Sequence, residues 1–164
     1  MCAGYRGVSG NFSVTVSVVE PVDIAAALEH ARSTNNGVLT TIRRDGRPQL
    51  SNISHAIGFD GVIRISITAD RAKFHNLKRD PRASLYVGQD DFQAYAVIDG
   101  DAFLPPPAAD PHDATVDELV QLYTAIRGVE HPDWEEYRRA MVTDRRTVVR
   151  LMPTRAYGYV PSNG

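Results

Sequence analysis

Apolar and polar residues alternate along three stretches between residues 37 and 70, and these stretches are rich in Val, Ile and Thr. Alternation with a period of two residues is typical of β-strands that bury one face. Two pairs, Asp45-Gly46 and Asp60-Gly61, separate the stretches, and Asp-Gly in such a position is the strongest short-range signal for a hairpin. We therefore predict an antiparallel meander of three strands.

The strand pattern returns later in the chain. Residues 82–88 and 95–104 predict two further strands, and Pro105–Pro107 ends this part of the sheet because proline has no N–H for the ladder. Strand-like residue pairs close the chain over residues 146–161. About six short strands interrupted by helices predict a small closed or split β-barrel with helices packed around it, a mainly β fold of the α+β class.

Helical spacing of apolar residues predicts two helices in the first half of the chain. Asp23 is a suitable N-cap for the first helix, over residues 24–33, where apolar residues recur every three or four positions. The second helix runs from Asp70 to Arg79, and Asp80-Pro81 ends it.

Two more helices are predicted in the second half. The third covers residues 115–127 behind Thr115, and Glu118, three positions later, completes a capping box. The fourth opens at Pro132 and extends to about Val142.

Composition indicates one domain. The chain has 164 residues, 43% hydrophobic and 23% charged, so we expect a single domain over residues 21–164 behind a flexible extension, residues 1–20, in which residues 12–19 could add an edge strand. Cys2 is the single cysteine, which predicts no disulfide framework and a reducing, cytoplasmic setting. The sequence has no stretch typical of a signal peptide or a membrane span. With a net charge of −2, we expect neither a membrane nor a nucleic acid as partner.

Six basic or imidazole side chains crowd into residues 71–82, between two strand patterns. Arg71 and Lys73 follow directly on the strand that ends at Thr68, at a turn into a helix whose free backbone N–H groups favour an anion. Arginine and lysine together can neutralise a phosphate from two sides. The segment predicts a phosphate site, and a plain solvated helix face is the alternative.

Polar residues also gather at the start of the second predicted strand, where Gln49, Ser51 and Asn52 follow the first Asp-Gly turn. Their amides and hydroxyl suit a ring with alternating carbonyl and N–H groups. Alternation places Gln49 and Ser51 on one face and Leu50 and Asn52 on the other. The alternative is the polar outward face of an ordinary strand.

Other kinds of site lack a motif. The sequence has no H-E-x-x-H pairing, no G-x-S-x-G elbow, no G-x-G-x-x-G and no P-loop, so a metal site is not expected and a nucleotide-like cofactor would have to be held another way. The five histidines, none of which forms such a pairing, are His30, His55, His75, His112 and His131.

The chain resembles the split-barrel flavin and deazaflavin oxidoreductases, the superfamily of pyridoxamine 5′-phosphate oxidase, in the order of four segments: GVLTTIRRDGRPQLSN, IRISITADRAKFHNLKRDPRASLYV, YAVIDGDAFL and DWEEYRRAMVTDRRTVVRLMPTRAYG. It is most similar to the actinobacterial branch that uses coenzyme F420. The resemblance covers about residues 22–160, and its most specific part is the run R-A-K-x-x-N-L-x-R-D-P-R-A-S at residues 71–84.

The resemblance implies an FMN-binding-like split barrel that forms an obligate homodimer with two cofactor sites at the interface. It assigns the cofactor phosphate to Arg71 and Lys73, with Ala72 between them. The remaining implied contacts are Gln49, Ser51 and Asn52 at the tricyclic ring, Ser66, Ile67 and Thr68 along the polyol, and Gln93, Ala94 and Tyr95 from the second subunit. Relatives often carry a tryptophan where this chain has Gln93, so an aromatic cover on the ring is expected to be missing at that position.

The activity implied by the resemblance is that of an F420H2-dependent reductase, which transfers a hydride from the reduced deazaflavin to an electron-poor small molecule. No side chain is assigned as a proton donor, and the substrate is not identified. Alternatives on the same fold are an FMN-dependent oxidoreductase and a non-catalytic carrier of F420 or FMN. A nucleic-acid-binding barrel that uses the basic helix is a further alternative, which the negative net charge disfavours.

Overall fold

The computed structural model describes residues 21–91 and 93–161. The expectations for Cys2, for the extension over residues 1–20 and for an edge strand at residues 12–19 lie outside the described residues. Among the helices that are described, none is long and apolar enough to cross a membrane.

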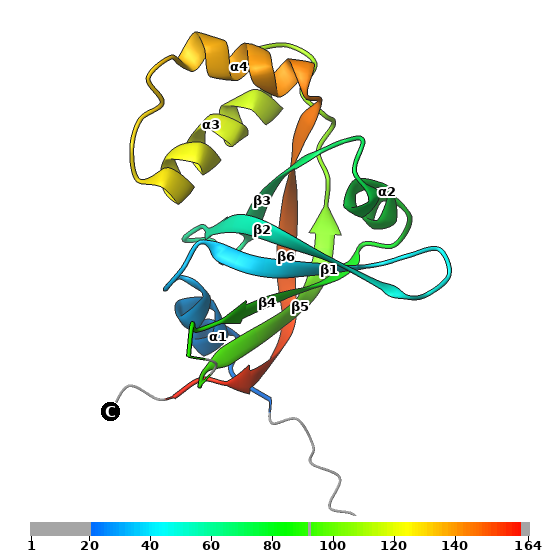
Figure 1. The fold of residues 1–164 in the computed structure, drawn as a ribbon, viewed down its shortest axis with the longest axis vertical. Helices are drawn as coiled ribbons and strands as arrows, with labels where there is room; N and C mark the ends of the chain where they lie inside the picture. The colour runs from blue at the N-terminus through cyan, green and yellow to red at the C-terminus, as the bar shows by residue number, and fades with distance from the viewer. Residues whose placement is uncertain (1–20, 92, 162–164) are drawn as a thin grey trace, which may run out of the picture.

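Six antiparallel strands form a closed barrel in the order β1-β2-β3-β6-β5-β4 (Figure 1). The predicted meander is confirmed as the first three strands, and the later strand patterns are confirmed as the other three. The closing segment forms one long strand rather than several short ones. The strands are β1 (Asn36–Ile42), β2 (Pro48–Ile57), β3 (Ile63–Thr68), β4 (Arg82–Gly88), β5 (Tyr95–Phe103) and β6 (Arg146–Tyr159).

Both Asp-Gly hairpins form as predicted. Gly46 and Gly61 adopt φ values of 82° and 75°, which L-residues with side chains rarely adopt. In each turn the aspartate side chain accepts a hydrogen bond from the backbone N–H two residues later, at 3.1 Å for Asp45 and for Asp60. These local contacts set the register in which β1 pairs with β2 and β2 begins to pair with β3.

The barrel is split between β2 and β3. Their ladder consists of three residue pairs, from His55↔Ile65 to Ile57↔Ile63, whereas β3 pairs with β6 along its whole length as far as Thr68↔Arg146. Within the described part of the chain, residues 66–68 of β3 therefore have a ladder partner on the β6 side and none on the β2 side. On that side the Thr68 carbonyl accepts the Arg71 N–H at 3.3 Å, and the backbone of Ser66 remains available to another partner.

Four helices accompany the barrel: α1 (Ile24–Ala31), α2 (Ala72–Arg79), α3 (Ala114–Arg127) and α4 (Trp134–Thr143). In Figure 1, α3 and α4 lie together at the top, α2 lies at the side of the barrel and α1 lies near its lower end. The Asp23 cap is confirmed, because its carboxylate accepts hydrogen bonds from the backbone of Ala25 and Ala26.

The other predicted helix starts need correction. Arg71 is the N-cap of α2, so that helix begins at Ala72 and not at Asp70. Asp133 is the N-cap of α4, so that helix begins at Trp134 and not at Pro132.

The predicted capping box at Thr115 and Glu118 is wrong. Asp113 caps α3 by accepting the Val116 N–H at 2.8 Å, and Thr115 instead donates its hydroxyl hydrogen to the Pro106 carbonyl at 2.9 Å. Glu118 is engaged by two arginines of the barrel. Thr115 is the second residue of the helix and so cannot be its N-cap, and Glu118 serves long-range ion pairs instead.

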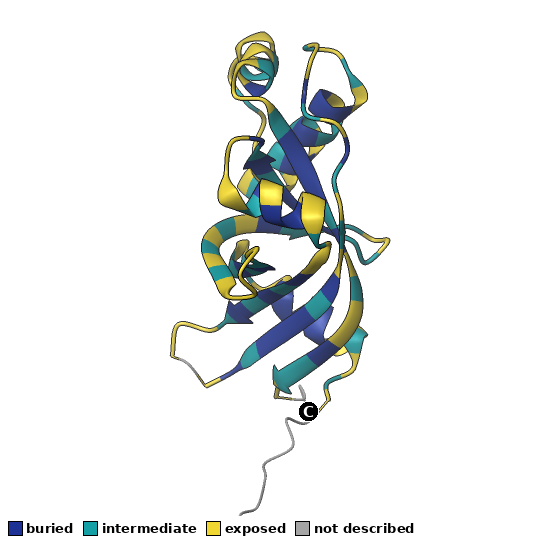
Figure 2. Cartoon of the chain, turned by 90° about the vertical axis from the view of Figure 1, so that its right-hand side faces the viewer, coloured by how far each residue is buried: buried dark blue, intermediate teal, exposed yellow. Residues whose placement is uncertain are grey.

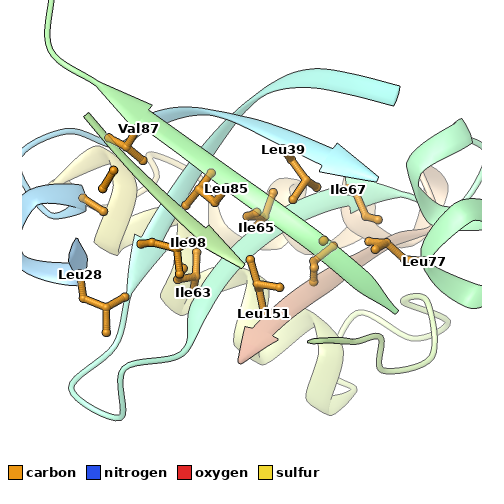
Figure 3. Close-up of a cluster of buried hydrophobic side chains, with 14 of the residues drawn as sticks. Leu28, Leu39, Ile63, Ile65, Ile67, Leu77, Leu85, Val87, Ile98 and Leu151 are labelled. Atoms are coloured by element: carbon orange, nitrogen blue, oxygen red, sulfur yellow. The ribbon is translucent and has the colours of Figure 1, made fainter. Parts of the chain in front are cut away.

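The barrel interior is filled by alternating aliphatic residues from all six strands, several of which Figure 3 shows converging on one another. A second, smaller cluster joins α3 and α4 to the outer face of β6 at Val148. In Figure 2 the buried residues are concentrated in the strands, and exposed residues lie on the helix surfaces and turns.

Candidate functional site

The predicted phosphate residues lie where β3 passes into α2. Arg71 has an extended backbone (φ −80°, ψ 149°), and α2 begins at the next residue. The Arg71 side chain is 69% exposed, and its one ion pair with a described residue is to Asp70, with Nε and Oδ1 3.8 Å apart. Lys73 is half-buried in the first turn of the helix. Among the described residues, no carboxylate lies within 4.0 Å of the Lys73 ammonium.

The electrostatics at this turn favour an added anion. The pKa of Lys73 lies below its ordinary value, chiefly because the ammonium is partly withdrawn from water and next because the Arg71 charge repels it, while Asp70 acts in the opposite direction. Asp70 is itself engaged by the Thr68 hydroxyl, which lowers the pKa of its carboxyl. Two cations with incomplete neutralisation beside free helix N–H groups can hold a phosphate.

The structure adds two cations that sequence reasoning missed. Arg145 and Arg146 lie beside the end of β3, because Thr68 pairs with Arg146 and the Arg145 carbonyl accepts the Ala69 N–H at 3.1 Å. The Arg146 guanidinium donates to Ser66 Oγ at 3.2 Å and contacts Asp144 at 3.3 Å. No local motif marks these residues, since they follow Thr68 by more than seventy positions.

Gln49 and Ser51 occupy the inward-facing side of β2, as the alternation predicts, and Leu50 and Asn52 face out. The Gln49 amide is already engaged: its oxygen accepts from Thr41 at 3.1 Å, and its nitrogen donates to Ser51 Oγ at 2.7 Å. Thr41 in turn accepts from Asn76 of α2 at 3.0 Å. This chain of hydrogen bonds holds Gln49 and Ser51 near α2, at the end of the barrel where β2 and β3 separate.

Asn52 lies on the outer face, apart from Gln49 and Ser51. It lines a hollow of about 520 Å³ together with Val38, Tyr86, Gln89 and Asp90. Its neighbour in the β1 ladder is Val38, and Val38 is flanked on its other side by Tyr86 of β4. The three predicted ring residues therefore do not face one surface.

Ser66 and Thr68 face outward and are half-buried, whereas the Ile67 side chain is 2% exposed and belongs to the barrel core. Ile67 can therefore meet a ligand only through its backbone. In an antiparallel strand the N–H and C=O of one residue point to the same side, and those of Ile67 point toward β6, as the Ala69 N–H does where it binds the Arg145 carbonyl. Within the described chain, the open β2 side therefore offers the backbone of Ser66 rather than that of Ile67.

Gln93, Ala94 and Tyr95 lie at the start of β5, where Tyr95 pairs with Gly88 at the far end of β4. Strand β4 carries the chain about 20 Å from the end of α2, at roughly 3.3 Å per residue. The side chain of Gln93 folds back to the Asp91 carbonyl at 3.4 Å, Ala94 is fully buried, and Tyr95 stacks on Tyr86 with ring centroids 5.9 Å apart. Among the described residues, no hydrogen bond, ion pair or aromatic contact joins residues 93–95 to Arg71 or Lys73.

A larger hollow than that at Asn52, about 670 Å³, lies between the β2–β3 hairpin and α3. Its charged lining is internally paired: Glu118 accepts from Arg64 Nε at 3.1 Å and from Arg150 at 2.6 Å, and Arg64 also binds Asp60 at 2.7 Å. Because these charges neutralise one another, this hollow is less suited to bind an ionic ligand than the start of α2 is. Among the described residues, no group of three or more His, Cys, Asp or Glu side chains is arranged to hold a metal ion.

Comparison with known proteins points to one family. The family described as pyridoxamine 5′-phosphate oxidase matches residues 24–159 of the chain. A solved structure titled F420 reductase is 25% identical, with 78% of this chain and 94% of that chain covered and a TM-score of 0.57.

Two other solved structures share the fold at lower identity. A conserved hypothetical protein from Mycobacterium tuberculosis is 23% identical, with 85% of each chain covered and a TM-score of 0.67. A putative pyridoxamine 5′-phosphate oxidase from Listeria innocua is 20% identical, with 84% of this chain and 96% of that chain covered and a TM-score of 0.57.

Proposed function

The chain belongs to the pyridoxamine 5′-phosphate oxidase family, and on that premise we propose that it is an F420H2-dependent reductase of electron-poor small molecules. The observation that carries the proposal is the pair of incompletely neutralised cations, Arg71 and Lys73, beside the split between β2 and β3. The likeness to a protein titled F420 reductase favours the deazaflavin over FMN. Members of this family commonly bind a cofactor of the flavin type.

The donor set fits such a cofactor in kind. Arg71, Lys73 and the first N–H groups of α2 suit a phosphate, and Thr68 adds a hydroxyl. The backbone and the hydroxyl of Ser66 suit a polyol. Gln49 and Ser51 on one face of β2, and Asn52 on the other, carry the amide and hydroxyl groups that ring carbonyls and N–H groups require. A ring bound at Asn52 would lie on the face opposite to Gln49 and Ser51, and a ring bound at Gln49 would require that residue to exchange at least one of its present hydrogen bonds.

When bound, F420 or FMN supplies hydride-transfer chemistry, and the protein supplies position and electrostatics. Arg71 and Lys73 bind far from the reacting carbon, so their binding free energy is available to orient the ring. Arg146, held by Asp144 and Ser66, keeps a positive charge at the same end of β3. No side chain is assigned a proton-donating role, and water could complete the reduction.

A second copy of the chain is part of the proposal. Tyr95 lies a whole strand length from the end of α2, so the contact proposed for residues 93–95 requires a partner subunit. Leu50, 61% exposed on the outer face of β2, is an apolar side chain that a partner would cover. We expect a homodimer, which sedimentation equilibrium would measure directly; a monomer at micromolar concentration would remove this part of the proposal.

The test of the proposed function is binding followed by turnover. Purified protein is incubated with F420 or with FMN, free ligand is removed, and the absorbance spectrum of the protein fraction identifies any bound cofactor. We expect F420 to be retained more tightly than FMN, and reduced F420 to be oxidised when electron-poor acceptors such as quinones or enones are supplied.

Each other outcome of this experiment selects an alternative. Preferential retention of FMN indicates an FMN-dependent oxidoreductase, and retention without oxidation by any acceptor indicates a cofactor carrier. If neither cofactor is retained, the proposed function is wrong.

A further inference from the structure

The outer hollow at Asn52 contains an aromatic side chain that no motif singled out. Tyr86 lies on β4, half-buried, and faces outward beside Val38. Asn52 faces outward from the other side of Val38. The amide and the phenol ring therefore flank a small apolar floor, two strand spacings apart, or about 10 Å.

The Tyr86 ring is held in a defined orientation. It stacks on Tyr95 of the neighbouring strand with an interplanar angle of 26°. It also lies over Gly88, where an added Cβ would come within 2.5 Å of the Tyr86 hydroxyl and 3.0 Å of its ring. Glycine at position 88 thus leaves the space that the ring occupies. Stacking on Tyr95 and the space that Gly88 leaves for the hydroxyl-bearing edge fix the ring, and no described residue forms a hydrogen bond with its hydroxyl group.

Residue 93 does not supply an aromatic side chain that could pack on the cofactor ring. Position 93 holds a glutamine, exposed, with its side chain turned back to its own turn. The stacked Tyr86–Tyr95 pair lies on the same outer face of the barrel as Asn52, with Val38 between Asn52 and Tyr86. The hollow it borders, about 520 Å³, is of the size that planar cofactors and ligands occupy.

We infer that Tyr86 is a positioning residue against which the planar ring of the redox cofactor packs, with Asn52 as the polar contact in the same hollow. This inference rests on the proposed function. An oriented aromatic face with an amide at its side recognises a flat conjugated ring that bears carbonyl and N–H groups. Tyr95 acts through Tyr86 by supporting its orientation.

The experiment separates stacking from a purely structural role. Tyrosine in contact with an excited flavin or deazaflavin quenches its fluorescence by electron transfer, and phenylalanine does not. Wild-type protein, Tyr86→Phe and Tyr86→Leu are titrated with F420 and with FMN, and the fluorescence of the bound cofactor and the melting temperature are recorded. Tyr123→Phe, in the aromatic cluster between α3 and α4, is the matched control.

We expect Tyr86→Phe to bind within about twofold of wild type while the bound cofactor becomes brighter, because the flat ring is retained and the electron donor is lost. Tyr86→Leu should weaken binding by about tenfold, the scale of a lost aromatic stacking contact. Tyr123→Phe should change neither quantity.

Two results would overturn the inference, and they are distinguishable. If wild type binds a cofactor but Tyr86→Phe quenches it equally and Tyr86→Leu binds it equally, Tyr86 does not contact the ring and the proposed function stands. If wild type binds neither F420 nor FMN, both the inference and the proposed function fail.

Discussion

The two ends of strand β3 carry similar charges and use them differently. At the Ile63 end, Arg64 is engaged by Asp60 and Glu118, and Glu118 also takes Arg150, so each charge has a close partner. At the Thr68 end, Arg71 has only a 3.8 Å contact with Asp70, and Lys73 has a lowered pKa. One end is electrostatically complete within the chain, and the other end is not.

The difference shows how to separate structural charges from ligand-binding charges. Glu118 is 13% exposed and joins α3 to β3 and β6, so its ion pairs fix the helix on the barrel. The raised pKa values of Arg64 and Arg150 arise first from their hydrogen bonds to Asp60 and Glu118, respectively. The pKa of Lys73 is lowered instead, because its partial burial and the positive charge of Arg71 outweigh the attraction of Asp70. Among the described residues, the Thr68 end of β3 therefore lacks a close anionic partner for Arg71 and Lys73.

The largest expected effect comes from breaking the ion pairs of Glu118 at the Ile63 end of β3. Glu118→Gln leaves two guanidinium groups facing each other near a half-buried surface, and we expect the free energy of unfolding to fall by about 3 kcal/mol, near the lower limit for breaking a buried pair because both arginines are partly exposed. Urea denaturation measures it. Glu29→Gln, which removes an exposed pair with Arg32, should change the same quantity by less than about 0.5 kcal/mol. Equal effects of the two substitutions would contradict the structural role of Glu118.

The next effect concerns the incomplete end. Lys73→Ala should weaken F420 binding by about 2 kcal/mol, roughly thirty-fold, the scale of a lost charge-assisted hydrogen bond. Its melting temperature should not fall, because the substitution also removes the repulsion between Lys73 and Arg71. Fluorescence titration at one salt concentration measures the affinity. Unchanged affinity for F420 and FMN would show that Lys73 is an ordinary surface cation.

We expect the free energy of unfolding to depend on pH through His55, which lies on β2 opposite Ile65, between the two ends of β3. His55 forms the last β2–β3 rung before the strands separate, is 1% exposed and donates through Nε2 to the Ala31 carbonyl at 3.1 Å if that nitrogen carries the proton. Burial lowers the pKa of His55 in the folded state, so between that value and about 6.5 the unfolded chain binds the extra proton.

The free energy of unfolding should therefore decrease as the pH falls below about 6.5, by at most about 1.4 kcal/mol per pH unit from this residue. Urea denaturation at pH 7.5 and 5.5 measures the decrease, and His55→Gln should make it smaller. His112→Gln, at an exposed histidine, should leave it as in wild type. An identical pH dependence in the His55 variant would exclude His55 as its source.

The smallest expected effect comes from the Asp113 N-cap of α3, the helix that carries Glu118. Asp113 accepts hydrogen bonds from Val116, Ala109 and Asp110, so Asp113→Ala should lower the free energy of unfolding by about 1 kcal/mol. Thermal denaturation followed by circular dichroism measures it. Thr115→Ser, which keeps the hydroxyl bond to Pro106, is the control at the position first expected to be the cap.

Much of the fold was accessible from sequence because its signals are local. Asp45-Gly46 and Asp60-Gly61 specify their turns through residues adjacent in the chain, and the alternation in β2 correctly separates Gln49 and Ser51 from Leu50 and Asn52. The capping box failed because α3 begins one residue before Thr115 with Asp113 as its cap. Glu118 instead binds two arginines, 54 and 32 positions away, and a local motif cannot register such distant partners.

The candidate site was only partly accessible for the same reason. Arg71, Ala72 and Lys73 are contiguous and stay together at the start of α2, as any helix start does. Arg146 reaches Ser66 only because β6 closes the barrel beside β3, and Tyr86 meets Tyr95 only through the β4–β5 register.

By itself, the sequence determined where the strands, turns and helices lie and which short segment concentrates positive charge, because periodicity and turn chemistry act over a few residues. Tertiary structure alone decided which of those charges are neutralised, where the β2–β3 ladder stops and which aromatic ring borders the Asn52 hollow. Those properties depend on the pairing of strands that are far apart in the chain, and barrel closure sets that pairing.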